Sequence, residues 1–323
     1  MTVEMAEKQE VAGGRLRWWL AGAGVFVAVL VAFVVYGLLH PLRLANEAMD
    51  VRLEWAGIHS RYVMVDGYSI HYYEGGPAAT AERPPVVLVH GLGGYAEQWA
   101  PMMLQLAKAH RRVYAMDLLG YGKSAKPMDA AYSVPEEAGI VQGFLKAKGI
   151  GGYDLVGWSM GGWVATQVAL DESQAGRVQK LVLMDSAGLR YTPDWNTNLF
   201  VPDTPAKLRA LDKLLFVKPP VLPGFVRSAV IREALREGWV IQRSMDSMLT
   251  GVDLEDGRLE QLHMPVLIVW GSDDRIIPLS VGERMHEEIP QSEMDVFEGC
   301  GHLGPVQCAG RIGPRMVGFL DGK

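Results

Sequence analysis

The sequence of 323 residues predicts an α/β fold: a mostly parallel sheet covered by helices, with an apolar helix added at the N-terminus. Three observations support this prediction. Short apolar runs alternate with helix-length segments over residues 61–188 and 263–323. The intervening residues 189–262 show helical patterns without a clear strand, and residues 18–39 form an uncharged apolar run.

The uncharged run of residues 18–39 has the length of a transmembrane helix. At about 1.5 Å per residue it spans a hydrocarbon core of roughly 30 Å. Tryptophans near one end and Tyr36 near the other suit the two membrane interfaces. The residues that follow offer no convincing small-x-small cleavage site for a signal peptidase. We therefore expect an uncleaved single-pass anchor in a cell membrane, such as the inner membrane, after a tail of residues 1–17.

Charges around the run slightly favour an N-terminus on the cytoplasmic side. Three cationic residues precede the run and two follow it: Lys8, Arg15 and Arg17, then Arg43 and Arg52. This difference is small, so the sequence leaves open on which side of the membrane the folded domain lies.

The linker, residues 40–60, carries apolar residues at helical spacing, namely Leu44, Ala48, Val51 and Trp55. This spacing predicts a short amphipathic helix. Such a helix either lies on the bilayer surface or packs on the domain as its first helix, and the sequence leaves both interpretations open.

The folded core is expected to open with a hairpin, because residues 61–66 and 68–74 flank Asp66-Gly67, a turn dipeptide. Continuous apolar runs then predict buried parallel strands at 86–89, 112–117, 153–157, 178–185, 265–270 and 293–297. Helix-length segments lie between most of them, at 97–108, 135–147, 160–172 and 279–289. Parallel strands require such crossovers.

Residues 189–262 interrupt this alternation. They contain several helical stretches and prolines at 193, 202, 205, 219, 220 and 223. A structureless loop of that length is improbable inside a compact domain. We therefore expect a helical cap at 189–262, inserted between a first core part, 61–188, and a second, 263–323.

Composition excludes some functions. A net charge of −6 provides no basic surplus for binding nucleic acid. A fold of this size needs no disulfide, so Cys300 and Cys308 are expected to be free thiols, which leaves the redox compartment open. The sequence contains no metal-ligand cluster and no phosphate-binding glycine loop, so we expect neither a metal nor a cofactor.

Gly157-Trp158-Ser159-Met160-Gly161 follows a predicted strand directly and precedes a predicted helix. In that context the Gly-x-Ser-x-Gly pattern indicates a nucleophile elbow, a sharp strained turn that exposes the serine at the carboxyl edge of the sheet. The helix dipole there favours a developing anion. Ser159 is therefore the predicted nucleophile.

A serine hydroxyl needs a base, usually a histidine oriented by a carboxylate. Of the eight histidines, only His302 lies in the loop after the last predicted strand, among glycines that let it reach the sheet edge. The acid is expected between serine and histidine in chain order. Asp274, at the end of a strand, is our first choice; Asp273 and Asp185 are the alternatives.

Acyl transfer also needs hydrogen-bond donors for the oxyanion. The glycine-rich stretch from His90 to Gly94 follows a strand, and we assign the donors to the backbone N–H groups of Leu92 and Met160. His90 is expected to stabilise this loop rather than to catalyse. The residues expected to contact substrate are Gly91, Trp158, Leu189, Trp195 and Phe200.

Five motifs, HGLGG, MDLLGYGKS, GWSMGG, WGSDDRIIP and GCGH, together resemble the α/β-hydrolase superfamily over residues 61–323. The resemblance implies an eight-stranded, mostly parallel sheet with a cap after the sixth strand, and catalysis by Ser159, Asp274 and His302. Asp274 fits best because the family's acid precedes two hydrophobic residues and a proline. The residues that match a structural loop after the fourth strand are Asp117, Gly120, Gly122 and Ser124.

The N-terminal span, LVLMDSAGLRY and WGSDD with GCGH look more specifically like the membrane-anchored monoacylglycerol lipases and related bacterial lipases and esterases. One departure is LGPVQCAGR after His302, where relatives usually carry Glu-x-Pro. This leaves the packing of the last helix open.

The expected activity is hydrolysis of carboxylic esters through an acyl-enzyme, with lipid-like esters such as monoacylglycerols as substrates and the bilayer as a partner. The alternatives are a carbon–carbon bond hydrolase or cofactor-free haloperoxidase on the same fold, and a non-catalytic membrane binding module. Epoxide hydrolases and dehalogenases usually need an aspartate in place of Ser159. The sequence indicates no oligomeric state.

Overall fold

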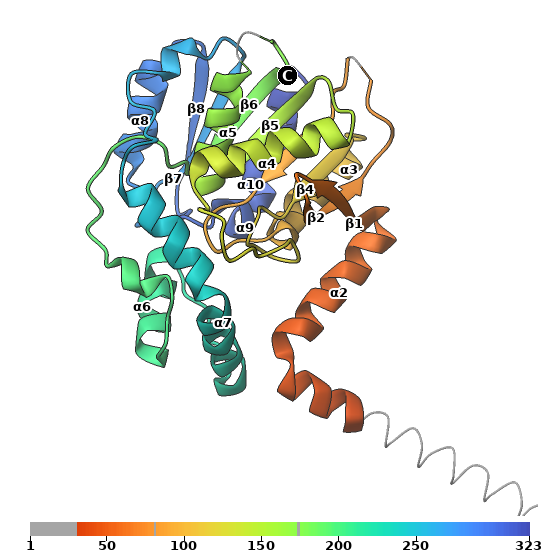
Figure 1. Cartoon of the computed structure of the whole chain (residues 1–323), viewed down its shortest axis with the longest axis vertical. Helices are drawn as coiled ribbons and strands as arrows, with labels where there is room; N and C mark the ends of the chain where they lie inside the picture. The colour runs from red at the N-terminus through yellow and green to blue at the C-terminus, as the bar shows by residue number, and fades with distance from the viewer. Residues whose placement is uncertain (1–30, 81, 173–174) are drawn as a thin grey trace, which may run out of the picture.

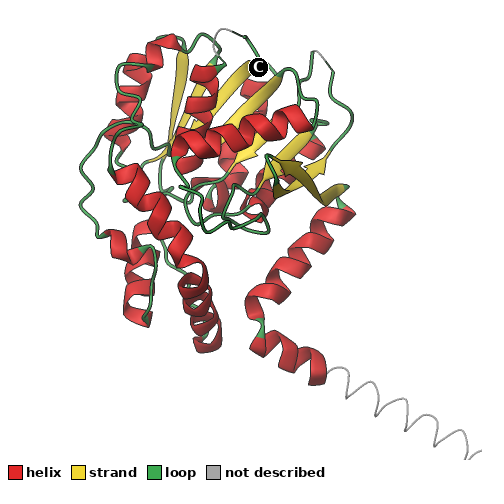
Figure 2. Ribbon diagram, viewed as in Figure 1, coloured by secondary structure: helices red, strands yellow, loops and turns green. Residues whose placement is uncertain are grey.

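The computed structural model describes residues 31–80, 82–172 and 175–323. At its centre is an eight-stranded sheet with helices packed on both faces (Figure 1, Figure 2). The strands are β1 (Ile58–Val65), β2 (Tyr68–Gly75), β3 (Val86–Val89), β4 (Val113–Met116), β5 (Tyr153–Trp158), β6 (Val178–Met184), β7 (Val266–Gly271) and β8 (Ser292–Phe297). Their order is β1-β2-β4-β3-β5-β6-β7-β8. The pairs β1–β2 and β2–β4 are antiparallel and the others parallel, which confirms the predicted mostly parallel sheet.

Alternation along the strands divides the helices between two layers, because successive side chains of a strand point to opposite faces. Val86 and Leu88 of β3 pack in the cluster that contains α2, α3 and α10, whereas Val87 and Val89 pack in the cluster that contains α4, α5 and α8. The helices of these layers are α2 (Pro41–Trp55), α3 (Ala100–Lys108), α4 (Val134–Ala147), α5 (Met160–Asp171), α8 (Leu279–Glu288) and α10 (Ala309–Leu320). A four-residue 3-10 helix, η1 (Ala96–Trp99), precedes α3.

Strand β8 differs from the prediction of a buried strand. Ser292 is buried, but the remaining residues are partly or fully exposed. The reason is topological: β8 is the last strand of the sheet and has only β7 as a neighbour. Arg315 of α10 pairs with Glu293 and Asp295 on this edge.

Between β6 and β7 the chain forms α6 (Pro205–Leu215) and α7 (Gly224–Leu249), with two short 3-10 turns, η2 (Thr197–Leu199) and η3 (Leu259–Gln261). Helix α6 begins where Thr204 accepts a hydrogen bond from the backbone N–H of Lys207, a capping contact that fixes its start. Figure 1 shows α6 and α7 projecting from the same side of the core as α2. The cap boundaries at 189 and 262 stay a prediction.

Helix α2 is the helix that the sequence predicts in the linker, residues 40–60. Leu53 is fully buried against the core and Met49 packs beside it, whereas Val51 and Trp55 are exposed, Trp55 at 87%. One face of the helix therefore packs on the domain. Because its outer face is also apolar, this helix can still lie on the bilayer surface, so both interpretations of the linker stay open.

Most of the expected membrane anchor, residues 18–30, lies outside the described residues. Residues 31–39 are helical, and Phe33, Val34 and Leu39 are each more than half exposed, at 57%, 52% and 61%. Within the described ranges, no helix combines the length and the apolar character needed to cross a membrane.

Cys300 and Cys308 form a disulfide, so the expectation of two free thiols is wrong. The short helix α9 (Gly304–Gln307) turns the chain back between them and brings their Cα atoms to 6.1 Å, within the range of a bridge. Both cysteines are buried. Fold size indicates only whether a bridge is needed, whereas the turn decides whether the two side chains meet.

Candidate active site

Ser159 occupies a strained turn between β5 and α5. Its φ is +59° and its ψ −123°, a conformation that residues other than glycine rarely adopt. Two glycines allow the turn. A Cβ on Gly157 would lie 2.2 Å from the carbonyl oxygen of Gly161, and one on Gly161 would lie 2.3 Å from that of His90. The turn places the serine at the carboxyl end of β5, as the Gly-x-Ser-x-Gly pattern predicts.

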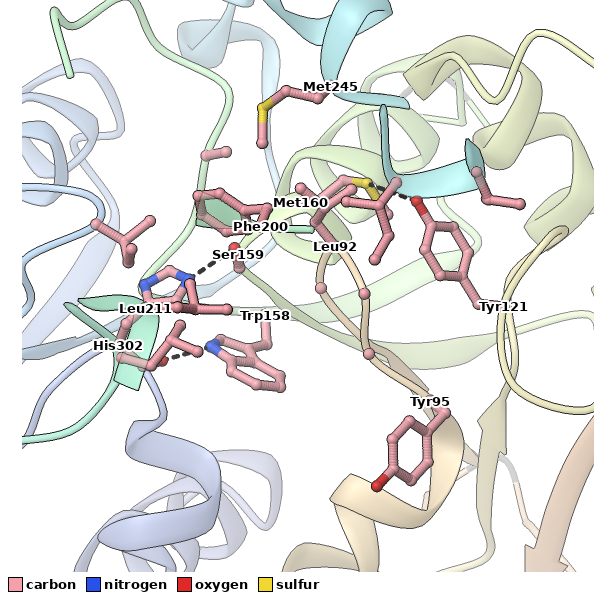
Figure 3. Close-up of a pocket in the computed structure, with 18 of the residues that line it drawn as sticks. Leu92, Tyr95, Tyr121, Trp158, Ser159, Met160, Phe200, Leu211, Met245 and His302 are labelled. Atoms are coloured by element: carbon pink, nitrogen blue, oxygen red, sulfur yellow. Dashed lines mark hydrogen bonds between the residues drawn. The ribbon is translucent and has the colours of Figure 1, made fainter. Parts of the chain in front are cut away.

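The structure brings Ser159, His302 and Asp274 together from three separate loops, and Figure 3 shows the first two facing each other. Ser159 Oγ lies 2.9 Å from His302 Nε2, and His302 Nδ1 lies 2.8 Å from Asp274 Oδ2. A carboxylate only accepts hydrogen bonds, so Nδ1 carries the proton and Nε2 accepts from the serine hydroxyl. The three side chains are nearly or completely buried. This is the arrangement that makes a serine nucleophilic.

Neither alternative acid contacts the histidine in this arrangement. Asp273 accepts a hydrogen bond from the hydroxyl of Ser272, and Asp185 accepts one from the backbone N–H of Gly271. Asp274 also accepts from the two backbone N–H groups two and three residues further on, at 2.7 and 3.0 Å. These bonds fix the carboxylate in its orientation toward the imidazole.

His302 is held through its backbone as well. The indole Nε1 of Trp158 donates to the carbonyl oxygen of His302 at 2.8 Å, a bond drawn in Figure 3. The disulfide between Cys300 and Cys308 closes the loop that contains the histidine. Trp158, expected only as a substrate contact, therefore also anchors the base.

The expected oxyanion donors lie beside the nucleophile. Leu92 and Met160 both line the cavity next to Ser159 (Figure 3), and neither backbone N–H donates to another group of the described residues. Gly91 lets the loop come this close, because a Cβ there would lie 2.9 Å from the serine Cβ. Two free N–H groups beside a nucleophile can stabilise a tetrahedral oxyanion.

His90 supports the loop. Its Nε2 accepts from the backbone N–H of Leu118 at 3.1 Å, so its Nδ1 carries the proton and donates to the carbonyl of Gly91 at 2.8 Å. Burial lowers the pKa of His90 below its ordinary value, so the ring is neutral.

A third buried histidine, His71 of β2, is not identified by any sequence pattern. It pairs with Asp117 at 2.7 Å, and both side chains are fully buried. Asp117 also accepts from the backbone N–H groups of Ala96 and Lys123, at 2.6 and 2.8 Å. This cluster joins β2 to the loops after β3 and β4, which both line the cavity. The signal available in the sequence was Asp117, which matches the family's structural loop.

A cavity of about 750 Å³ opens at Ser159 and His302. All five residues expected to contact substrate line it: Gly91, Trp158, Leu189, Trp195 and Phe200. Two of them are fixed in place, since the indole of Trp195 donates to the carbonyl of Ile276 at 2.8 Å and its ring lies 5.0 Å from that of Phe200. Figure 3 shows Phe200 and Met245 above the serine and Leu211 beside His302.

The cavity also extends to α2, which sequence patterns do not reveal. Leu42, Arg43 and Asn46 of α2 line it, together with α7 residues that include Glu233 and Arg236. One wall of the cavity is therefore built by the helix that directly follows the expected membrane anchor.

Within the described part of the chain, no three histidine, cysteine, aspartate or glutamate side chains are grouped as metal ligands. The expectation that the protein uses neither metal nor cofactor stays a prediction.

Residues 84–211 and 231–307 match the family model described as the alpha/beta hydrolase fold. The chain belongs to this family. Both matched stretches contribute to the site, the first with Ser159 and the second with Asp274 and His302. The residues between the two stretches, 212–230, lie in the insertion between β6 and β7.

Relatives of this α/β hydrolase include two kinds of enzyme. It is 31% identical to the 2-hydroxymuconate semialdehyde hydrolase of Pseudomonas sp. (strain CF600), over 73% of this chain and 86% of that protein. It is 29% identical to Lipase 1 of Psychrobacter immobilis, over 76% of this chain and 78% of that protein. The crystal structure of a bacterial membrane phospholipase A matches with a TM-score of 0.78 and 26% identity, over 95% of this chain and 98% of that one. The protein is therefore a hydrolase with lipases among its relatives.

Proposed function

We propose that this α/β hydrolase cleaves carboxylic esters through an acyl-enzyme and takes lipid-like esters, such as monoacylglycerols, as substrates. The observation that carries the proposal is the cavity that joins Ser159 to α2, the helix next to the expected membrane anchor. An ester drawn from the bilayer would enter this space with its acyl chain along the apolar wall and its carbonyl at the serine.

In this mechanism His302 Nε2 takes the proton of Ser159 as Oγ attacks the ester carbonyl carbon. The N–H groups of Leu92 and Met160 stabilise the oxyanion, and Asp274 stabilises the imidazolium that forms. His302 then gives its proton to the leaving alcohol. A water molecule, deprotonated by the same imidazole, hydrolyses the acyl-enzyme and restores the serine.

The side chains that line the cavity wall favour an apolar substrate. The wall contains many leucine, isoleucine, methionine and aromatic side chains from the sheet edge, α6 and α7. Of its four cationic residues, two are paired with carboxylates: Lys123 with Asp50 and Glu97, and Arg236 with Glu233 and Glu237. A lipase and a membrane phospholipase A among the similar proteins point in the same direction.

The rival function is carbon–carbon bond hydrolysis, which the 31% identity to 2-hydroxymuconate semialdehyde hydrolase favours. Names of further relatives, such as 2-hydroxy-6-oxononadienedioate hydrolase, denote substrates with two carboxylates. A dianionic substrate needs cationic partners. Lys123 and Arg236 are already paired with carboxylates, whereas Arg43 and Arg190 also line the cavity and have no carboxylate partner within the described residues. The charges of the wall therefore leave the choice between the two functions to the substrate panel.

For localisation we propose a membrane-anchored protein whose catalytic domain faces an oxidising compartment. Two independent observations support this side. Disulfides such as Cys300–Cys308 form and persist in oxidising compartments. The cationic residues before the apolar run outnumber those after it, which favours a cytoplasmic N-terminus. An alkaline phosphatase fused after Lys323 should therefore be active in cells. An inactive phosphatase, paired with a fluorescent GFP fusion, would reverse the orientation.

A substrate panel tests the activity. Full-length protein in detergent micelles would be given monoacylglycerols and p-nitrophenyl esters of graded chain length, a diacyl phospholipid and a 2-hydroxy-6-oxo-dienoate. We expect kcat/KM to rise with acyl chain length and to vanish in Ser159→Ala. Preference for the shortest esters would refute the lipid substrate, and cleavage of the dienoate alone would refute ester hydrolysis.

A matched pair of variants tests the role of α2. Leu42→Trp fills the cavity wall, whereas Val51→Trp adds the same bulk at an exposed position of the same helix. We expect Leu42→Trp to lower kcat/KM for long-chain esters by about tenfold or more, which is the usual effect of a steric block in a hydrophobic pocket. The kcat/KM for short-chain esters should not change. Equal effects of both substitutions would contradict this.

A further inference from the structure

Asp185 is a buried carboxyl that the proposed mechanism does not use. It follows β6 directly, its side chain is fully buried, and its φ of +45° lies in the left-handed region that disfavours side chains. Its Oδ1 accepts a 2.7 Å hydrogen bond from the backbone N–H of Gly271, the last residue of β7. A strained residue with an uncompensated carboxyl inside the core calls for a functional explanation.

The other oxygen of this carboxyl points toward the triad. Asp185 Oδ2 has no hydrogen-bond partner within the described residues, and the carboxyl of Asp185 lies next to that of Asp274. Gly304, two residues after the catalytic histidine, closes this space, because a Cβ on it would lie 3.0 Å from the same oxygen. The two carboxyls therefore share one enclosed site.

Two adjacent carboxyls in a buried site do not both ionise. Burial first, and then the negative charge of Asp274, raise the pKa of Asp185 well above its ordinary value. Asp274 accepts three hydrogen bonds, two from backbone N–H groups and one from His302, whereas Asp185 accepts one. The carboxyl that accepts more hydrogen bonds keeps the charge, so the proton resides on Asp185. The other titratable groups next to Asp274 are His302 and Tyr191, and neither offers Asp185 a charge partner.

We propose that Asp185 is a positioning residue that acts through Asp274: as a neutral carboxylic acid it turns its hydroxyl toward the triad carboxylate and fixes the orientation in which that carboxylate holds His302. The inference rests on the proposed function, because it takes Asp274 as the triad acid. It explains why a third acid lies at this edge of the sheet without contacting the histidine.

The neutral and the ionised forms of Asp185 predict different results for an isosteric substitution. Asp185→Asn keeps the shape and a hydrogen-bond donor but cannot ionise. If Asp185 is neutral, the substitution changes no charge, and the acid limb of the kcat/KM profile, which reports protonation of the free enzyme's base, stays where it is. If Asp185 is ionised, the substitution removes a negative charge near His302, and the acid limb moves to lower pH.

The experiment measures pH profiles of ester hydrolysis, with p-nitrophenyl butyrate as substrate, for wild type, Asp185→Asn and Asp185→Ala. We expect Asp185→Asn to keep kcat within about threefold and the acid limb within about 0.2 pH units, since no charge is lost. Asp185→Ala should lose about tenfold or more in kcat with KM within about twofold, the pattern of a lost transition-state interaction. It should also move the acid limb to higher pH. Without the hydroxyl of Asp185 as a donor, the carboxylate of Asp274 attracts the proton on His302 more strongly.

A matched control is Glu137→Gln. Glu137 is also fully buried, and burial raises its pKa, but its carboxyl accepts from the backbone N–H of Leu119 and has no hydrogen bond to a triad residue. The acid limb should not move in this variant. If Asp185→Ala melts too low to assay, Asp185→Ser takes its place, with a neutral donor on a shorter side chain and an expected intermediate kcat.

Three results would overturn the proposal: an acid limb that falls in Asp185→Asn, full activity in Asp185→Ala, or a loss in Asp185→Asn as large as in Asp185→Ala. Failure of the proposed function is distinguishable from each of these. In that case the wild-type enzyme itself would hydrolyse no ester of the substrate panel.

Discussion

The disulfide gives the prediction that can be worked through most fully. Replacing both Cys300 and Cys308 by serine removes a bridge between residues eight positions apart. The loop that this bridge closes contains His302. Loop-closure entropy for a ring of that size corresponds to about 2.5 kcal/mol at 25 °C in the chain-entropy model. For a core of this length, an unfolding entropy of roughly 2.1 cal/mol/K per residue converts the loss into a fall of about 4–5 °C in Tm.

Activity should fall together with stability, because the bridge closes the loop that positions the base. We expect kcat of the double variant to drop severalfold while KM changes less, since the cavity wall is built mainly by other segments. Differential scanning fluorimetry measures Tm with and without reductant, and ester hydrolysis measures kcat. The reductant should lower Tm of the wild type to that of the variant and leave the variant unchanged.

The refuting result is simple to obtain. Protein purified from an oxidising compartment and denatured without reductant would show two titratable thiols per chain instead of none. In that case the bridge does not form, and the argument for the side of the membrane loses one of its two supports. A Tm that is identical with and without the bridge would refute the entropy argument alone.

Three further predictions concern the site and the core. Gly91→Ala should lower kcat by about a hundredfold or more, the scale of a lost oxyanion donor, because its Cβ would lie 2.9 Å from that of Ser159 and displace the oxyanion loop. Trp158→Phe should destabilise the protein by about 1–3 kcal/mol and lower kcat, because the carbonyl of His302 loses its donor inside the core. Glu255→Gln should flatten the dependence of Tm on pH above about pH 4.3. Burial raises the pKa of Glu255, so its contribution to stability is complete below about pH 4.3, the pKa in the unfolded chain, and is lost as the pH rises through the folded pKa.

Controls and contrary outcomes separate these effects. Gly139→Ala adds a methyl group where no atom lies within 4 Å, so it should leave kcat unchanged; a loss there would discredit the steric reasoning. An unchanged kcat in Trp158→Phe would mean that the indole does not hold the base. If Tm depends on pH as steeply in Glu255→Gln as in the wild type, the Glu255 carboxyl is ionised in the folded protein. That result would contradict the prediction, because neither of its oxygens has a hydrogen-bond partner in the described residues.

Local sequence patterns were enough to predict most of the fold and the convergence of the three catalytic side chains. Runs such as VVLV at 86–89 determine a strand by themselves, and Gly157 and Gly161 are required by close backbone approaches that recur at any nucleophile elbow. Ser159, Asp274 and His302 could be named because each lies within a few residues after the end of a strand, and the carboxyl ends of parallel strands share one edge.

Features that depend on tertiary neighbours could not be predicted in this way. Exposure of β8 follows from its place at the sheet edge, and the disulfide follows from the turn made by α9. The apolar spacing in the linker predicts a helix but does not show that Leu42 would face a cavity under α7. Likewise, Asp185 and Asp274 are far apart in the chain, and nothing in their local sequences indicates that they share a proton.

The most direct test of the central claim is mass spectrometry of the intact protein after reaction with a fluorophosphonate. We predict that one equivalent is bound at Ser159, that Ser159→Ala binds none, and that His302→Ala reacts far more slowly because its hydroxyl has lost the base 2.9 Å away. A folded wild-type protein that remains unmodified, or one that reacts equally fast without the imidazole, would contradict the account.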